Sequence, residues 1–183
     1  MITTGTVETE HLHLRPVIEE DADSVWLLHS DARTNRYNPA GPMTDRSQAE
    51  EQAREWAANW VADGHGYWAL EESHVPGVVI GFGGIRATNW RGRQVYNLYY
   101  RLAPAAWGKG LASELVAAAV ERWHELGEHL PLVAYTTAEN LPSQRTALKG
   151  GLTRRPDLDD VTATYTDVVF ALGLDWSSLR NLI

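Results

Sequence analysis

The apolar residues between positions 99 and 127 change their spacing partway along the stretch. A short apolar run leads to Pro104, and Gly108 and Gly110 follow it within a few residues. After Gly110, apolar residues recur every three or four positions, which is the period of an amphipathic helix packed on a core. Gly127 suits the end of that helix, because a residue without Cβ adopts the left-handed conformation easily. The pattern therefore predicts a strand, a glycine loop and a helix, in that order.

The rest of the chain alternates between strand-like and helix-like patterns, without an internal repeat or a linker. Apolar runs and alternations predict strands at 12–16, 67–72, 78–85, 94–102, 132–136 and 165–172. Helical spacing predicts helices at 21–29, 47–62, 111–126, 140–149 and 175–182. We therefore expect an α+β chain, with one sheet and helices on both of its faces, as a single domain over residues 1–183.

Several boundaries depend on single polar residues or glycines. Asp21 is expected to cap the first helix, and Thr44 or Ser47 the second, because their side-chain oxygens accept from free helix amides. Residues 89–93 predict a polar turn between two strands. Glycines within the strand at 78–85 indicate a bulge or a close approach of another element.

The composition narrows the classes of protein and of partner. The 183 residues are 44% apolar, enough for a sizeable core, and a net charge of −8 argues against non-specific binding to nucleic acid or to an anionic membrane. The absence of cysteine excludes disulfides and a cysteine nucleophile. Without a transmembrane-length apolar run or a signal-peptide pattern, we expect a cytoplasmic protein. The seven histidines show no ligand spacing, so we expect no metal site.

A glycine loop before a helix has a chemical meaning, because the first amides of a helix lack internal partners and carry positive potential. Gly108, Gly110 and Ala112 would let a phosphate approach the main chain closely. Neither a P-loop nor a dinucleotide-binding motif is matched. A polyanionic ligand would need a local positive patch, such as the helix start with Lys109. A turn whose glycines serve geometry alone is the alternative.

The segment Trp107–Ala112, which reads WGKGLA, resembles the acetyl-coenzyme A (acetyl-CoA) loop of the GNAT superfamily of N-acetyltransferases, whose signature is Q/R-x-x-G-x-G/A. Trp107 departs from Gln or Arg, and a Trp-Gly-x-Gly version is common in the branch resembling ribosomal-protein N-terminal acetyltransferases (RimJ/RimL-like). Further segments resemble that branch in the same order: Leu12–Pro16, Asn140–Leu152, where Leu152 replaces a Phe, and Tyr165–Asp167. The resemblance covers almost the whole chain. It implies the GNAT fold, a mixed and mostly antiparallel sheet splayed at the coenzyme-binding strand.

The resemblance also implies residues for the coenzyme. Loop amides would hold its diphosphate, and the strand end at Leu102, with Ala103 beside it, would align the pantetheine arm and polarise the thioester oxygen. Asn140 matches a residue that contacts that arm or an ordered water, and Ser143 matches the group that protonates the coenzyme thiolate. Helix capping is the alternative for both. The implied coenzyme-binding residues are Leu102, Ala103, Trp107, Gly108, Lys109, Gly110, Leu111, Ala112, Asn140 and Ser143.

The general base is harder to place. Related enzymes often carry Glu on the strand before the loop, where this chain has Asn97, and many use a Tyr as the acid where it has Ala147. The resemblance makes Asp159, or Asp160 beside it, a candidate base, with a solvated acidic turn as the alternative. We interpret Asp167 as structural, because it lies within a predicted strand.

Other candidates lie on the preceding elements. Glu71 and Glu72 end a predicted strand, and one of them could face the site. Tyr37, Trp56 and Trp68 could line a pocket for the acceptor, since the family places its substrate-side elements in this part of the chain. Packing of a helix on the sheet is the alternative for each Trp.

These features favour an acetyl-CoA-dependent N-acetyltransferase that acts on a primary amine, such as a protein N-terminus, an amino acid or another small amine. Because no strong base is evident, we expect an amine of low pKa, with an α-amine ahead of a lysine side chain. The alternatives are a non-catalytic, acyl-CoA-binding regulatory module and an α+β domain without a coenzyme. We expect a monomer or homodimer with no nucleic-acid or membrane partner.

Overall fold

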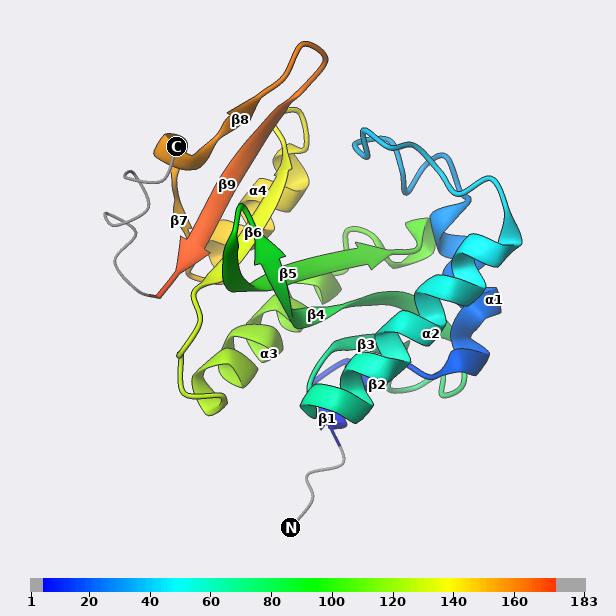
Figure 1. Ribbon diagram of the computed structural model, residues 1–183. Coiled ribbons are helices and arrows are strands. Elements are labelled where there is room, and N and C mark those ends of the chain that lie inside the picture. The colour runs from blue at the N-terminus through cyan, green and yellow to red at the C-terminus, as the bar shows by residue number, and fades with distance from the viewer. Residues whose placement is uncertain (1–4, 174–183) are drawn as a thin grey trace.

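The computed structural model describes residues 5–173 (Figure 1). The strands are β1 (Val7–Glu8), β2 (Leu12–Pro16), β3 (Tyr67–Glu72), β4 (Val79–Trp90), β5 (Arg93–Leu102), β6 (Leu132–Thr137), β7 (Thr153–Arg154), β8 (Asp160–Val161) and β9 (Thr166–Leu172). The helices are α1 (Ala22–His29), α2 (Arg46–Asp63), α3 (Leu111–Glu125) and α4 (Leu141–Lys149). Among the helices of the described residues, none combines the length and apolar character needed to span a membrane.

One mixed sheet joins all the strands, in the order β1-β2-β3-β4-β5-β6-β9-β7, with β8 paired to β9. Every pair is antiparallel except β5 and β6. That parallel pair holds only two residue pairs, Tyr96↔Leu132 and Asn97↔Val133, after which the strands diverge. The sheet therefore has two arms, and Figure 1 shows β5 and β6 pointing away from each other between them. The expected α+β class and the splayed mixed sheet are confirmed.

The two faces of the sheet are covered by different helices. Residues from α3 and α4 pack in one apolar cluster with Leu98 and Leu102 of β5 and Phe170 of β9. Residues from α1 and α2 pack in a second cluster on the opposite face, around Trp56 and Phe82. Because side chains alternate along a strand, neighbouring residues of β5 face different helices. This alternation places Tyr99 and Arg101 on the opposite face from Leu98, Tyr100 and Leu102.

The β4–β5 hairpin is longer than expected. The predicted turn at 89–93 is a two-residue turn of Arg91 and Gly92, and Asn89 and Trp90 pair with the returning strand. Both turn residues have positive φ, 52° and 77°, as the tight hairpin turn that matches strand twist requires. The predicted strand at 78–85 was therefore too short, because polar residues next to the turn were interpreted as loop.

Two helix caps also differ from expectation. Asp45, rather than Thr44 or Ser47, caps α2, because its carboxylate accepts from the Ser47 N–H while Gln48 reaches back in a capping box. Asp21 precedes α1, but its carboxylate binds Arg15 instead of a helix amide. The predicted helix at 175–182 lies outside the described residues. Strands β1, β7 and β8 were not predicted, since two-residue strands leave no periodic signal.

The glycines of β4 allow close packing. A Cβ on Gly83 would lie 2.6 Å from Leu115 Cδ2 of α3, and one on Gly81 would lie 2.7 Å from the Arg101 carbonyl. The β3–β4 register also shifts here, since Leu70 pairs with Gly81 and Glu71 pairs with Val79. Both expected reasons for glycine therefore hold: the glycines let α3 pack close to β4, and β4 pairs with the strand that leads to the glycine loop.

Candidate active site

A cavity of about 1180 Å³ lies where β5 and β6 diverge. Its lining comes from the end of β5, the glycine loop and start of α3, the far half of β6, α4, and the start of β9. The loop between α1 and α2 closes the side opposite the β8–β9 hairpin, and the two stand on either side of the opening in Figure 1. The splay of the sheet thus creates the cavity.

The main chain of β5 points into the gap at alternate residues. The Ala103 N–H donates to the Ile80 carbonyl at 2.8 Å, so Ala103 continues the ladder with β4. In an antiparallel ladder the intervening residues direct their amides the other way, and Tyr100 and Leu102 therefore face the gap. The indole N–H of Trp107 donates to the Leu102 carbonyl at 2.8 Å. Leu102 therefore lines the cavity as expected, whereas the Ala103 amide is bound to Ile80 of β4 and is not free for a ligand.

The glycine loop has the conformation of a main-chain anion site. Gly108 and Gly110 have φ of 75° and 83°, and a Cβ on either would meet no atom within 4 Å. Ser113 and Glu114 donate to the Gly110 carbonyl, while the amides of Leu111 and Ala112 find no partner among the described residues. The left-handed backbone explains the glycines, and the open space and free amides at the start of a 15-residue helix suit a phosphate.

The positive charge near the loop is not where the sequence placed it. The Lys109 ammonium binds Glu72 of β3 at 2.8 Å and does not line the cavity. The cations that do line it are Arg33, Arg36, Arg101 and Lys149. The structure therefore does not place Lys109 at the cavity, where it was expected to provide the local positive patch, because Glu72 of β3 binds its ammonium.

The start of α4 presents Asn140 and Ser143 to the cavity. The Asn140 side chain caps the helix by accepting from the Ser143 N–H at 3.3 Å, and its amide donates to Thr136 Oγ1 at 2.9 Å. The Tyr100 hydroxyl lies 2.9 Å from Ser143 Oγ and donates to the Ser143 carbonyl at 2.8 Å. Burial raises the pKa of Tyr100. The phenol is therefore neutral and holds the serine hydroxyl at the end of the open β5 edge.

The candidate bases are held by cations outside the cavity. Asp159 binds Arg154 through both carboxylate oxygens, at 2.5 and 2.6 Å. Glu71 binds Arg15 at 2.8 Å, and Glu72 binds Lys109. None of these carboxylates, nor Asp160, lines the cavity.

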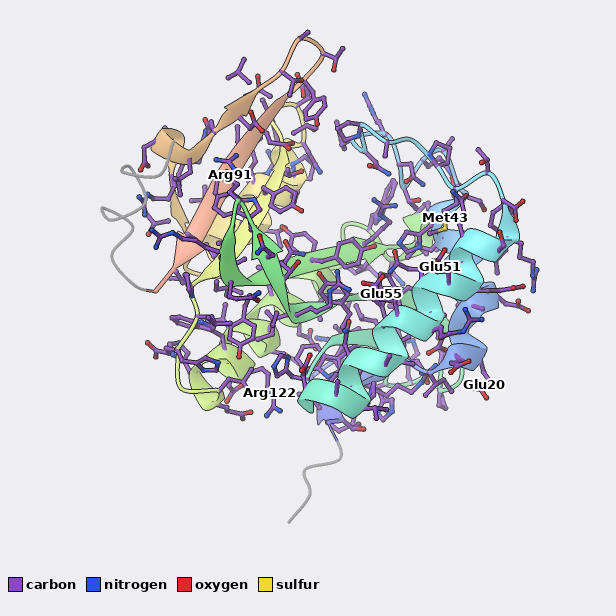
Figure 2. All side chains as sticks on the ribbon, viewed as in Figure 1. Glu20, Met43, Glu51, Glu55, Arg91 and Arg122 are labelled. Atoms are coloured by element: carbon purple, nitrogen blue, oxygen red, sulfur yellow. The ribbon has the colours of Figure 1, made fainter. Side chains whose placement is uncertain are left out.

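Asp167 is the only carboxylate among the described residues that lines the cavity. Burial raises its pKa, the nearby charge of Asp160 raises it further, and Arg91 opposes both. Arg91 lies at the β4–β5 turn (Figure 2) and donates to the Leu158 carbonyl at 2.9 Å. The interpretation of Asp167 as purely structural therefore misses its position at the surface of the cavity.

The expected acceptor residues divide between cavity and core. Tyr37 lines the cavity from the α1–α2 loop. Trp68 was expected to line the acceptor pocket, but it does not line the cavity. It is 1% exposed, and its indole N–H donates to the Gly5 carbonyl within the protein. Trp56 is buried as well, in agreement with the packing alternative.

The sequence reasoning missed Tyr100 and Arg101, which line the cavity from β5. Alternation from Leu102 could have placed Tyr100 on the same face as Leu102. Its contact with Ser143 carried no sequence signal, because the two residues meet only when α4 packs on the sheet.

Comparisons with known proteins agree with this geometry. A profile of the acetyltransferase (GNAT) domain family matches residues 11–153. The uncharacterized N-acetyltransferase YoaA of Bacillus subtilis (strain 168) is 27% identical over 147 residues, which cover 79% of this chain and 81% of YoaA.

Two solved structures have the same fold. The acetyltransferase from Agrobacterium tumefaciens strain C58 superposes with a TM-score of 0.75 at 25% identity, covering 92% of this chain and 94% of that one. The ribosomal-protein-S5-alanine acetyltransferase from Vibrio fischeri superposes with a TM-score of 0.70, covering 93% of this chain and 97% of that one. Its identity is 14%, so this likeness speaks for the fold alone.

Proposed function

This chain belongs to the acetyltransferase (GNAT) family, and on that premise we propose that it transfers an acetyl group from acetyl-CoA to a primary amine of low pKa. One observation carries the proposal. The open edge of β5, the free amides at the start of α3, and Ser143 all face one cavity. A main-chain edge beside an anion site suits an extended ligand that carries phosphates at one end.

We assign the coenzyme to the wall of the cavity that the open edge of β5 and the glycine loop form. Acetyl-CoA supplies an acetyl group activated as a thioester, together with phosphates and amide groups by which it can be held. The amides around Gly108, Gly110 and Ala112 would bind the diphosphate, and the backbone of Tyr100 and Leu102 would align the pantetheine arm. Trp107 supports this wall by fixing the Leu102 carbonyl.

Ser143 is our candidate for the proton donor to the departing sulfur. Its hydroxyl lies beside the neutral Tyr100 phenol, which fixes its orientation. Asn140 caps the helix turn that presents Ser143, and Asn140 itself also lines the cavity. Asp159, the residue implied as the base, would have to leave Arg154 before it could accept a proton from an amine.

Within residues 5–173 the one carboxylate that lines the cavity, Asp167, lies on β9 of the other arm and not at the β5 edge, which favours an acceptor that is already partly neutral. An α-amine with a pKa near 8 is neutral in about one molecule in ten at pH 7, whereas a lysine side chain with a pKa of about 10.4 is neutral in about one in 2,500. This difference corresponds to roughly 3 kcal/mol. The proposed acceptors are therefore a protein N-terminus, an amino-acid α-amine or a comparable small amine.

Release of free coenzyme thiol tests the function directly. We expect turnover with peptides that have a free N-terminus and much slower turnover with N-blocked peptides that contain lysine, at pH 7. Faster reaction of the blocked lysine peptides would contradict the low-pKa proposal. Tight binding of acetyl-CoA without thiol release from any amine in a broad panel would instead identify a regulatory module.

A further inference from the structure

Arg101 and Asp167 stand on the same face of the sheet, one on each arm. Leu98 and Leu102 of β5 pack on the face that α3 covers, so Arg101, between Tyr100 and Leu102, points to the opposite face. On β9, Phe170 packs on the α3 face, and by the same alternation Asp167 points to the opposite one. A cation and a carboxylate therefore share one face on the two sides of the splay.

Arg101 and Asp167 also lie at the same distance from the point where the two arms diverge. The last paired residues of the two arms are Asn97 and Val133. Arg101 comes four residues after Asn97, and Thr137, the cross-strand partner of Asp167, comes four residues after Val133. Each position is thus roughly 13 Å along its strand from the point of divergence. Both line the cavity, so they face it from opposite arms.

Arg101 lacks an anionic partner within the part of the chain that the structure describes. Its guanidinium donates to the neutral side-chain oxygen of Asn35 at 2.7 Å, and it lies over the Tyr99 ring. By contrast, Arg33, which also lines the cavity, binds the Asp31 carboxylate at 2.6 Å. A half-buried guanidinium that contacts only neutral groups retains most of its positive potential for an anion in the cavity.

Asp167 faces the cavity without a bound cation in residues 5–173. Arg91 acts on it electrostatically but forms its contacts with the Leu158 carbonyl and with Asp160 at 3.9 Å. Beside Asp167, Thr137 is 5% exposed and lines the cavity, and its hydroxyl oxygen has no hydrogen-bond partner. A buried hydroxyl without a partner is costly, and a ligand that binds it removes that cost. A carboxylate beside a free hydroxyl offers hydrogen-bond acceptors to the N–H groups of an amine.

We propose that the acceptor carries an anionic group in addition to its amine, with the amine bound at Asp167 and Thr137 and the anion at Arg101. This inference rests on the proposed function and narrows its substrate class to zwitterionic acceptors. The anion is a carboxylate, either at the C-terminus of a short peptide or on an acidic side chain close to the reacting N-terminus. Placement on opposite arms favours an acceptor whose charges lie several bonds apart.

Matched acceptors that differ only in one carboxylate test the proposal. One pair is the dipeptide Ala-Ala and its C-terminal amide, and the other is Ala-Glu amide and Ala-Gln amide. In the wild-type protein we expect kcat/KM to favour the acid by about tenfold in at least one pair, as for one charge-assisted hydrogen bond. The pair that shows the preference tells the two carboxylate sources apart. Equal rates within both pairs would overturn the proposal without any variant.

Variants assign the preference to a residue. Arg101→Gln keeps a donor for Asn35 but removes the charge, and we expect the acid preference to fall below about twofold. Arg101→Lys should retain part of it, and Arg46→Gln, an equal charge change at an exposed residue of α2, should retain all of it. Asp167→Asn should lower kcat/KM for acid and amide alike by about tenfold, because it weakens the amine end that both share.

The remaining outcomes separate this inference from the proposed function. If Arg101→Gln weakens acetyl-CoA binding and leaves the acid preference unchanged, Arg101 belongs to the coenzyme wall and the proposal is wrong. If no amine in either pair or in the broad panel releases thiol while acetyl-CoA still binds, the proposed transferase function fails together with this inference. Turnover without an acid preference refutes only the zwitterionic acceptor.

Discussion

The cavity has two walls that are made of different chemistry. The wall that we propose for the coenzyme, the coenzyme wall, is main chain, built from the open edge of β5 and the glycine loop within one continuous segment, 100–112. The wall that we propose for the acceptor, the acceptor wall, consists of side chains from distant parts of the sequence: Tyr37, Arg101, Thr137 and Asp167. A main-chain site depends on backbone dihedrals, whereas a side-chain site depends on how the elements assemble. The two walls should therefore respond differently to substitution and to pH.

The largest effect is expected from blocking the main-chain wall. Gly110→Glu places bulk and negative charge in the open space at the start of α3, and we expect acetyl-CoA affinity to fall about 1,000-fold, or about 4 kcal/mol. Gly64→Glu is the matched control, because Gly64 also has positive φ (69°) and open surroundings but ends α2 far from the loop. Calorimetric titration of both variants measures the difference.

The control also corrects for stability. A non-glycine residue in the left-handed region costs about 1–2 kcal/mol at either position, so both variants should unfold at similarly lowered temperatures. If Gly110→Glu binds acetyl-CoA as well as Gly64→Glu does, the phosphate site at the loop is refuted.

The next effect concerns the support of the acceptor wall. His29 of α1 is buried, and its ring lies 2.9 Å from the Val25 carbonyl through Nδ1 and 2.8 Å from the Tyr99 hydroxyl through Nε2. A neutral ring that donates to Val25 can accept from Tyr99. Burial, helped by the charge of Arg101, lowers the pKa of His29 to about 4.

The sign of the pH effect follows from that lowered pKa. The unfolded chain takes up a proton near pH 6.5, whereas the folded protein resists it until about pH 4, so stability present above pH 6.5 is lost as pH falls through this window. The loss is about 3 kcal/mol. Urea unfolding at pH 7 and pH 4 should show a smaller pH-dependent loss in His29→Gln, which keeps an amide for these contacts. An equal loss in both proteins would contradict the assignment.

A smaller effect is expected where the two walls meet. Ser143→Ala should lower kcat about tenfold and leave the dissociation constant for acetyl-CoA within about twofold, because the hydroxyl is needed only as charge develops on sulfur. Tyr100→Phe should lower kcat by less, since it removes only the group that orients the serine. If both rate and affinity match wild type in Ser143→Ala, the residue serves only the helix turn.

The difference between the walls also explains what the sequence could reveal. Gly108 and Gly110 were found from sequence because a left-handed backbone restricts the residue type, and the long strands and helices were found because their periodicity is local. Trp107, in the place of a Gln or Arg, was found as a departure, but its hydrogen bond to Leu102 was not. The conformation of the glycine loop and the long elements were thus predictable from local sequence, whereas the splay was implied by the family resemblance.

Side-chain partners were not predictable in the same way. Asp159 matches a candidate base by its position in the sequence, but Arg154 binds its carboxylate. Lys109 lies in the glycine loop, but Glu72 of β3 binds its ammonium. Asp167 was set aside because it lies in a strand, although the register with Thr137 places it at the cavity. Each case depends on residues far apart in sequence, whose meeting is set by the tertiary fold.

The smallest expected effect tests whether the acceptor wall costs stability. The pKa of Asp167 is raised in the folded protein, mainly by burial, so its ionised form destabilises the fold at neutral pH. For a raised pKa, stability is present below the ordinary value and lost as pH rises through the folded-state value. Asp167→Asn should therefore raise Tm at pH 7 by about 1–2 °C, a modest gain because solvent screens the partly exposed carboxylate.

The gain should shrink to nothing below about pH 4, where wild-type Asp167 is also neutral. Asp31→Asn is the control of opposite sign, because Arg33 lowers the pKa of Asp31 and its ionised form stabilises the fold. Thermal unfolding of the three proteins across pH measures both shifts. A lowered Tm for Asp167→Asn at pH 7 would mean that Asp167 already has a cation within the protein. In that case the carboxylate is not free for an amine, and the acceptor wall is held together by its own charges.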